Sequence, residues 1–260
     1  MDCALPLSIR SLSYSYDGKR KVLSDVDIDI DFGETIGIVG MSGSGKSTLA
    51  KFLQQELLAP VGTCFMAGCD ISKVSMEALY RNVVYLGHEE YVLEGTVRDC
   101  ISMGKVIEDK AMIEALTMVK MWSVFEEQAG LDTILRENGS NLSGGQKQRL
   151  ALARGLLHPG ALLILNEATS SIDEESETII MDYIRSLKGS RSILIISHRM
   201  ANTENCDRIY VLDEGKLIEH GDRDNLLKNN GIYSSLYREQ MAYENFGKGE
   251  RFENNSSEAV

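Results

Sequence analysis

One glycine-rich segment carries the residues whose types and spacing are best suited to chemistry. The segment reads Gly40-Met41-Ser42-Gly43-Ser44-Gly45-Lys46-Ser47-Thr48. It lies between a short apolar stretch (36–39) and a run of helical character that begins near Lys46. Glycines at this spacing allow a tight turn in which successive backbone N–H groups converge on one anion, and the following helix adds the positive end of its dipole. The segment therefore predicts a site for the phosphates of a nucleotide.

Side chains in and near this segment have expected roles. Lys46 is predicted to reach the β- and γ-phosphates as a point charge, Ser47 to ligate Mg²⁺ and Thr48 to support the α-phosphate side. The alternative is a Gly/Ser-rich turn that only opens a helix, and the flanking strand and helix disfavour it. Upstream, Tyr16 could stack on the nucleotide base through its π-face, although Tyr14 in the same alternating stretch competes for this role.

A second helix start also has the features of an anion-binding site. It reads Leu142-Ser143-Gly144-Gly145-Gln146-Lys147-Gln148-Arg149. Ser143 is a typical N-cap, and Gly144 with Gly145 leaves the first helical N–H groups uncovered. Because the first loop already provides one helix end for its nucleotide, the second must meet a phosphate held elsewhere. The simplest arrangement is two copies of the chain that sandwich two nucleotides.

Two apolar runs, 161–165 and 193–196, are typical of central parallel strands covered on both faces. The first is followed by Asn166 and Glu167, and the second by His198. In an open α/β sheet, the carboxyl ends of the strands form the ligand-binding edge. Taken alone, Glu167 would more often be a surface acid and His198 a structural histidine. Their shared edge and the upstream loop favour functional roles for both.

The remaining pattern predicts two smaller parts beside this α/β core. The stretch 7–16 alternates in hydrophobicity and turns at 17–18, and 25–32 alternates aspartates with Val, Ile and Phe, so we expect antiparallel strands with one wet acidic face. From 87 to 128 the pattern is helical, which indicates a helical insertion. The stretches 210–212 and 216–219 read as a closing hairpin.

Composition narrows the class of protein. The chain has 260 residues, 43% of them hydrophobic and 25% charged, as in ordinary globular proteins. Its net charge of −12 argues against a nucleic-acid partner. An odd number of cysteines without metal-ligand spacing indicates reduced thiols in the cytosol: Cys3, Cys64, Cys69, Cys100 and Cys206. The apolar runs are too short to span a bilayer, so any membrane connection requires another chain or a segment missing here.

The order of these motifs resembles the nucleotide-binding domain of ATP-binding cassette (ABC) transporters. The resemblance covers roughly residues 7–240 and rests on the phosphate loop (residues 40–48) together with the signature segment (residues 142–146). The stretches 95–99, 137–139 and 218–221 are most similar to the exporter branch. There the cassette usually follows a six-helix membrane domain, so a chain that starts at Met1 without one suggests an excised domain, although a separate subunit is possible.

The resemblance implies a fold and a domain organisation. The fold class is α/β, a P-loop NTPase core with a mostly parallel sheet, an antiparallel β subdomain and a helical signature subdomain. The ATPase domain would span 1–243, with the helical subdomain inserted at about 87–156, and 244–260 would form a disordered tail. The domain would lie on the cytoplasmic face of the cell membrane. Its partners would be a second cassette, identical or paralogous, and a transmembrane domain in the same or another chain.

The resemblance also implies cofactors, ATP and Mg²⁺, and site roles. Glu167 becomes the general base, His198 the switch histidine that contacts the γ-phosphate, and residues 170–173 the D-loop that crosses to the partner. The remaining nucleotide contacts would come from the base-stacking aromatic, the phosphate loop and the signature segment: Tyr16, Gly40, Ser42, Gly43, Ser44, Gly45, Lys46, Ser47, Thr48, Ser143, Gly144, Gly145 and Gln146.

Two positions depart from the family pattern. Asn166 stands where the strand normally ends in Asp, so Mg²⁺ would be held without that negative charge. His88 stands in place of the Gln that senses the γ-phosphate and Mg²⁺. Both changes fit tolerated drift in a working ATPase. They fit equally a weakened or silent site within a heterodimer, or an introduced mutation at Asn166. The leading hypothesis is an energy-coupling exporter ATPase, and the alternatives are a weakly hydrolytic regulatory cassette or a non-transport cassette acting on DNA or the ribosome.

Overall fold

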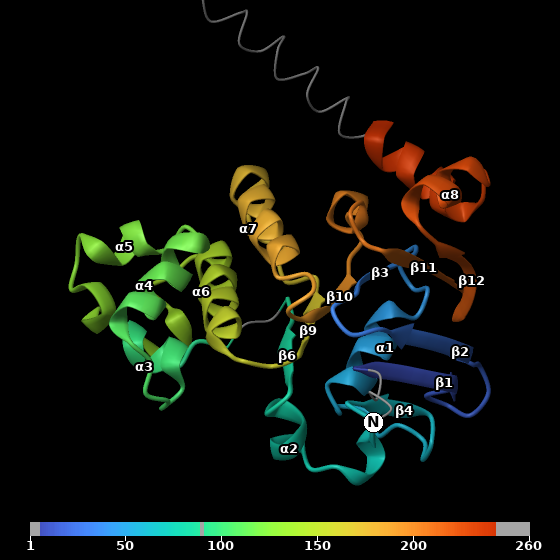
Figure 1. Cartoon of the computed structure of the whole chain (residues 1–260), viewed down its shortest axis with the longest axis horizontal. Helices are drawn as coiled ribbons and strands as arrows, with labels where there is room; N and C mark the ends of the chain where they lie inside the picture. The colour runs from blue at the N-terminus through green and yellow to red at the C-terminus, as the bar shows by residue number, and fades with distance from the viewer. Residues whose placement is uncertain (1–5, 89–90, 243–260) are drawn as a thin grey trace, which may run out of the picture.

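The computed structural model describes residues 6–88 and 91–242 of the chain. The expected tail at 244–260 and Cys3 lie outside the described residues. Figure 1 shows a central sheet with a helical part on one side and a second, antiparallel sheet on the other. In the described parts of the chain, no helix combines the length and the apolar character needed to cross a bilayer.

The central sheet has six strands in the order β12-β11-β3-β10-β9-β6, and all neighbours are parallel except β12, which is antiparallel to β11. Every residue of β3 and β10 is buried, as expected for strands covered on both faces. This sheet confirms the α/β class. Its strands are β3 (Thr35–Val39), β6 (Val83–Leu86), β9 (Leu162–Asn166), β10 (Ser192–Ile196), β11 (Arg208–Asp213) and β12 (Lys216–Gly221).

A four-stranded antiparallel sheet with the order β2-β1-β4-β5 packs beside the core. In β2, Val26, Ile28 and Ile30 are buried while Asp25 and Asp27 are exposed, so the acidic face is solvated as predicted. The alternation was expected to reach Phe32, but the strand ends earlier and this side chain is 62% exposed. The strands are β1 (Leu7–Tyr14), β2 (Leu23–Ile30), β4 (Cys64–Met66) and β5 (Cys69–Asp70).

The helix after the phosphate loop is shorter than its sequence pattern predicts. We expected it to run to about Leu58, but α1 (Lys46–Leu53) ends five residues sooner. The reason is that Gln55 adopts a left-handed φ of 59°, and its side-chain amide donates to the Ile71 carbonyl at 2.7 Å, which turns the chain away. The other helices of the core are α2 (Met76–Tyr80), α7 (Glu174–Ser186), α8 (Arg223–Lys228) and residues 232–242.

The stretch with helical periodicity (87–128) and the helix that starts at the signature segment form a group that lies together in Figure 1. It contains α3 (Val97–Ser102), α4 (Asp109–Met118), α5 (Trp122–Glu126), α6 (Gly144–Leu157) and the short strand pair β7 (Gly95–Thr96) and β8 (Ile134–Leu135). Short 3-10 turns complete the chain: Ile71–Lys73, Gly130–Asp132, Glu137–Gly139 and Met200–Thr203. Buried side chains on α4, α6 and α7 join this group to one face of the central sheet. The boundaries at 87–156 and 1–243 stay predictions.

Candidate nucleotide-binding site

The phosphate loop connects the end of β3 to the start of α1. At its first residue, a Cβ on Gly40 would lie 2.1 Å from the Leu212 carbonyl oxygen, so only glycine fits this close approach. At its end, Gly45 is the N-cap of α1 with a left-handed φ of 111° and no side-chain cap. The N–H groups of the first helical turn therefore have no side-chain acceptor and are available to an anion.

Lys46 folds back over the loop that precedes it. Its Nζ donates to the carbonyl oxygens of Gly40 at 2.7 Å and Met41 at 2.9 Å. Burial lowers the pKa of Lys46, and the negative charge of Glu167 opposes that shift. The ammonium is thus held, partly desolvated, beside the N–H groups of the loop, where it adds to the positive potential that attracts a phosphate.

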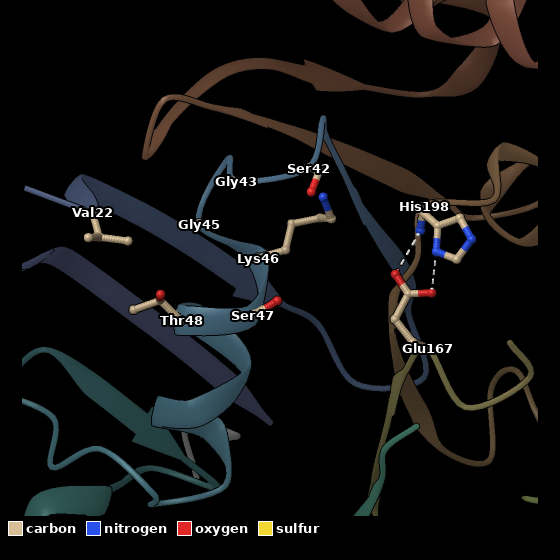
Figure 2. A pocket seen from close by; sticks show the side chains of 9 residues that line it. All are labelled: Val22, Ser42, Gly43, Gly45, Lys46, Ser47, Thr48, Glu167 and His198. Carbon is tan, nitrogen blue, oxygen red and sulfur yellow. Dashed lines mark hydrogen bonds and ion pairs between the residues drawn. The ribbon is translucent and has the colours of Figure 1, made fainter. Parts of the chain in front are cut away.

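Glu167 and His198 face the phosphate loop as a pair (Figure 2). Glu167 directly follows β9, and His198 lies two residues beyond its parallel neighbour β10, at the same sheet edge. The His198 Nδ1 lies 2.5 Å from Glu167 Oε2, and the His198 backbone N–H donates to Oε1 at 3.0 Å. Glu167 itself has a left-handed φ of 54° and donates its backbone N–H to the Ile196 carbonyl at 3.0 Å. One backbone contact and one ring contact therefore fix the carboxylate, and a further backbone hydrogen bond holds the main chain of Glu167.

A cavity of about 510 Å³ separates the loop from this pair, as Figure 2 shows. Its lining consists of Val22, Ser42, Gly43, Gly45, Lys46, Ser47, Thr48, Glu167 and His198. A second cavity of about 790 Å³ shares Ser47, Glu167 and His198 with the first and extends to His88 and Asn166. The structure thus brings the phosphate loop and the two predicted catalytic side chains to one continuous space.

Asn166 ends β9 and is anchored by a residue that the sequence patterns did not single out. Its Nδ2 donates to the Tyr85 hydroxyl, on the adjacent strand β6, at 2.8 Å. With the nitrogen so engaged, the carbonyl oxygen Oδ1 is the atom left to face the cavity. Tyr85 reads in the sequence as one more residue of a buried strand, and only the pairing of β6 with β9 identifies its role.

The donor atoms at this edge fit Mg²⁺ if phosphates supply most of the ligands. Ser47 and Asn166 contribute oxygen donors to one cavity, and Mg²⁺ commonly binds one or two protein oxygens together with substrate phosphates. Within residues 6–88 and 91–242, no group of three or more His, Cys, Asp or Glu side chains is placed to hold a metal ion. His88 is exposed and lines the same cavity, and its carbonyl oxygen accepts from Gln148 Nε2 at 3.2 Å.

Tyr16 lies beside the loop rather than in the lining of the first cavity. Its hydroxyl is 3.3 Å from the Thr48 Oγ1, and the residue is 57% exposed. Tyr14 packs edge-on against both Tyr16 and Phe52, with centroid distances of 5.0 Å in each case. Because Tyr14 is committed to the core and Tyr16 is exposed, the open ring face available to a base belongs to Tyr16.

The signature segment starts α6 as its residue types predict. Ser143 accepts from the Gln146 backbone N–H at 3.2 Å, and the Gln146 side chain accepts from the Ser143 N–H at 2.8 Å, a capping box. Gly144 has open space where a Cβ would point, whereas a Cβ on Gly145 would lie 2.6 Å from the Ser171 carbonyl oxygen. Neither of the two cavities described above is lined by residues 143–146.

Gln148 joins three of the predicted functional segments, and sequence reasoning missed it. Its side chain is buried, donates to the His88 carbonyl and to Ser170 Oγ at 3.1 Å, and accepts from the Ser171 N–H at 2.8 Å. A glutamine two residues after Gln146, just before the apolar part of the helix, was the available signal. It ties the start of α6 to residues 170–173 and to the end of β6.

An α/β sheet with a glycine-rich phosphate loop and an acid–histidine pair at its carboxyl edge defines a nucleoside-triphosphate-binding domain. Residues 23–170 match the model of the family described as ABC transporter, and the chain belongs to this family. This match confirms the resemblance to ABC transporters.

Similar proteins carry this domain in longer chains. An uncharacterized ABC transporter ATP-binding protein of Haemophilus influenzae is 38% identical over 92% of this chain and 43% of its own length. The ATP-dependent lipid A-core flippase of Alcanivorax borkumensis is 35% identical over 92% of this chain and 41% of its own length. The lactococcin-A transport/processing ATP-binding protein LcnC of Lactococcus lactis is 39% identical over 89% of this chain and 32% of its own length. The chain therefore spans less than half the length of these relatives.

Among solved structures, a bacterial Atm1-family ABC exporter with ATP bound is similar to this chain. The TM-score is 0.85 at 28% sequence identity, over 93% of this chain and 43% of that chain. This agreement supports the mixed α/β architecture with its antiparallel part and its helical part. Relatives that flip or export substrates do not favour the regulatory and nucleic-acid alternatives.

Proposed function

We propose that this chain is the ATP-hydrolysing motor of an exporter. In it, two such domains close head to tail around two ATP molecules and move an attached membrane domain on the cytoplasmic face of the membrane. The observation that carries this proposal is the Glu167–His198 pair, fixed across a cavity from the phosphate loop. A loop that only stored a nucleotide would need no carboxylate held opposite the terminal phosphate.

Each side chain has a role in this reaction that follows from its position. Lys46 and the N–H groups at the start of α1 bind the β- and γ-phosphates. Glu167 accepts a proton from the water whose oxygen bonds to the γ-phosphorus, while the bond to the bridging oxygen breaks and its electron pair leaves with ADP. Mg²⁺ held near Ser47 and Asn166 would neutralise charge on the phosphate oxygens. Tyr16 offers its ring to the base.

His198 orients the Glu167 carboxylate. This contact also determines which nitrogen of the His198 ring carries the proton. An ionised carboxylate only accepts hydrogen bonds, so the contact to Glu167 requires a proton on Nδ1. Nε2 is then the ring atom that faces a phosphate. It accepts in the neutral ring and donates only when the ring carries a second proton.

The signature segment supports a nucleotide site that is formed by residues of two chains. Ser143 and Gly144 are exposed at a helix start, and the space beside Gly144 is open. Gly145 instead packs against the loop at 170–173, which keeps this helix start in a fixed position. A partner chain that turned its phosphate loop toward this surface would complete both sites by symmetry. The part of the second cavity that is lined by His88 and Tyr91 is the proposed contact for the membrane domain.

A mixing experiment tests the head-to-tail arrangement. Lys46→Ala removes the phosphate contact in its own chain, and Ser143→Arg blocks the signature segment that serves the partner. Each variant alone is expected to be inactive. A mixed dimer contains one site with both parts intact, so it is expected to have about half of the parent rate. An equimolar mixture with random pairing, in which about half of the dimers are mixed, is expected to recover about a quarter of that rate. Absence of any recovery, with mixed dimers detected by mass, would contradict the arrangement.

Asn166→Asp is expected to accelerate Mg²⁺-dependent hydrolysis. The new carboxylate adds a charge-assisted contact worth about 1.5–3 kcal/mol, which lowers the half-saturating Mg²⁺ concentration by about 10- to 100-fold. The Tyr85 hydroxyl can donate to the new carboxylate, so the anchor at the strand end is retained. The measurement is the hydrolysis rate across a Mg²⁺ titration. Asn82→Asp, which adds the same charge at an exposed position, is the control. If neither the half-saturating Mg²⁺ concentration nor the rate at saturating Mg²⁺ changes, Asn166 neither weakens Mg²⁺ binding nor limits turnover.

A further inference from the structure

A buried polar cluster lies directly behind the Glu167–His198 pair. It consists of one carboxylate, three neutral polar side chains and a half-buried guanidinium. Glu177 is only 6% exposed, and the neutral members are between 3% and 8% exposed. The members are Thr169, Glu177, Ser197, Arg199 and Asn202.

The Glu177 carboxylate is the centre of this cluster. Its Oε1 accepts from the Thr169 hydroxyl at 2.6 Å and from Asn202 Nδ2 at 3.0 Å. Its Oε2 forms an ion pair with Arg199 Nη1. Ser197 Oγ accepts from the Arg199 backbone N–H at 3.0 Å, which closes the network on the loop after β10.

These contacts connect the two strand ends that carry the site. Thr169 is two residues beyond Glu167 on the loop after β9, and Arg199 directly follows His198 on the loop after β10. Glu177 belongs to neither loop, because it lies in α7. A single carboxylate on a helix therefore joins the loop of the general base to the loop of the switch histidine.

Because the Glu177 carboxylate is buried, it depends on the groups that surround it. A buried charge is costly unless a counter-ion and hydrogen bonds compensate it, so Glu177 requires Arg199, Thr169 and Asn202 in their present positions. The same requirement fixes the backbone on both sides of the site. A second ion pair, Arg208–Glu34 at 2.9 Å, offers a comparison: it is also partly buried, but Glu34 precedes β3 and thus lies at the opposite edge of the sheet.

We propose that Glu177 is a positioning residue for ATP hydrolysis, which sets the orientation of His198 relative to Glu167 through its contacts with Arg199 and Thr169. The inference rests on the proposed function in so far as Glu167 and His198 act on ATP. The phosphate loop lies on β3 and α1, outside this network. Disruption of the network therefore affects the chemical step and leaves nucleotide binding largely intact.

Glu177→Gln separates the charge from the shape of the side chain. A glutamine oxygen still accepts from Thr169 and Asn202, but the ion pair with Arg199 is lost. We expect the hydrolysis rate at saturating ATP to fall by about tenfold or more, because misplacement of catalytic groups by fractions of an ångström is costly. The half-saturating ATP concentration is expected to change by less than about threefold. Glu34→Gln, the matched control, is expected to change the rate by less than about twofold.

A spectroscopic readout distinguishes positioning from general destabilisation and needs no ATPase activity. The chain has four histidines, so the ring ¹⁵N signals of His198 can be assigned by substitution of the others. Glu177→Gln is expected to shift the His198 ring signals, and Glu34→Gln is expected to leave them in place. In a Glu167→Gln background, Glu177→Gln is expected to reduce the residual rate by less than about twofold, because it acts through the same groups.

The outcomes separate the inference from the proposed function. A parent chain that hydrolyses no ATP defeats the proposed function, and the His198 signals alone then decide the role of Glu177. Unchanged His198 signals and an unchanged rate in Glu177→Gln overturn the inference. If that variant does not fold, Arg199→Lys keeps the charge with a different geometry. It is expected to shift the same signals and lower the rate, and the absence of both effects overturns the inference equally.

Discussion

Glu167→Gln is expected to slow ATP hydrolysis by about 10²- to 10⁴-fold, the usual contribution of a positioned general base. Glutamine keeps the size of the side chain and can still accept from the His198 N–H, but it cannot take the proton of the attacking water. ATP binding is expected to persist, because the phosphate loop is unaffected. The variant should therefore accumulate ATP-bound dimers, which size-exclusion chromatography with light scattering would detect.

Glu175→Gln is the matched control for this variant. Glu175 is an exposed carboxylate in the first turn of α7, eight residues along the chain, and its replacement is expected to leave the hydrolysis rate within about twofold of the parent. Equal turnover in Glu167→Gln and the parent would remove Glu167 from the role of base. A collapse of turnover in both variants would indicate a stability effect instead.

Lys46→Ala is expected to weaken ATP binding by about 10- to 100-fold. The substitution removes a charged donor to the phosphates, a contact worth about 1.5–3 kcal/mol. It also removes the hydrogen bonds from Nζ to the carbonyl oxygens of Gly40 and Met41, so the loop loses part of its preorganisation. Isothermal titration with ATP and with ADP measures both affinities, and a larger loss for ATP is expected because Lys46 reaches the γ-phosphate.

Lys228→Ala provides the comparison on a helix away from the site. Lys228 is exposed in the last turn of α8 and lines neither cavity, so its replacement changes the net charge equally without touching the loop. Its effect on ATP affinity is expected to stay within about threefold. Equal affinities in Lys46→Ala and the parent would show that the phosphates bind elsewhere.

Much of the fold follows from short-range pattern. The apolar runs at β9 and β10, the alternation in β2 and the cap at Ser143 each depend on neighbours in the chain, so the sequence predicts them directly. The sequence does not predict the end of α1, because the Gln55 side chain donates to a carbonyl oxygen sixteen residues away and the helix stops before it. The prediction that β2 extends to Phe32 is wrong for a related reason, because periodicity does not reveal where a strand stops pairing.

The site also contains residues that the sequence predicts and residues that it does not. The phosphate loop is a contiguous motif, and the edge position of Glu167 and His198 follows from their strands. The groups that hold them are invisible to pattern. Glu177 reads as one more acid in an acid-rich first turn, Tyr85 as a residue of a buried strand and Gln148 as an ordinary helical amide. Each has its role only because elements distant in sequence pack against one another.

The most direct test of the account is a structure of Glu167→Gln with ATP and Mg²⁺. The account predicts two chains in which the phosphates of each nucleotide contact residues 40–48 of one chain and residues 143–145 of the other, with the base beside Tyr16. Phosphates bound away from residues 40–48, or a site completed within a single chain, would contradict it.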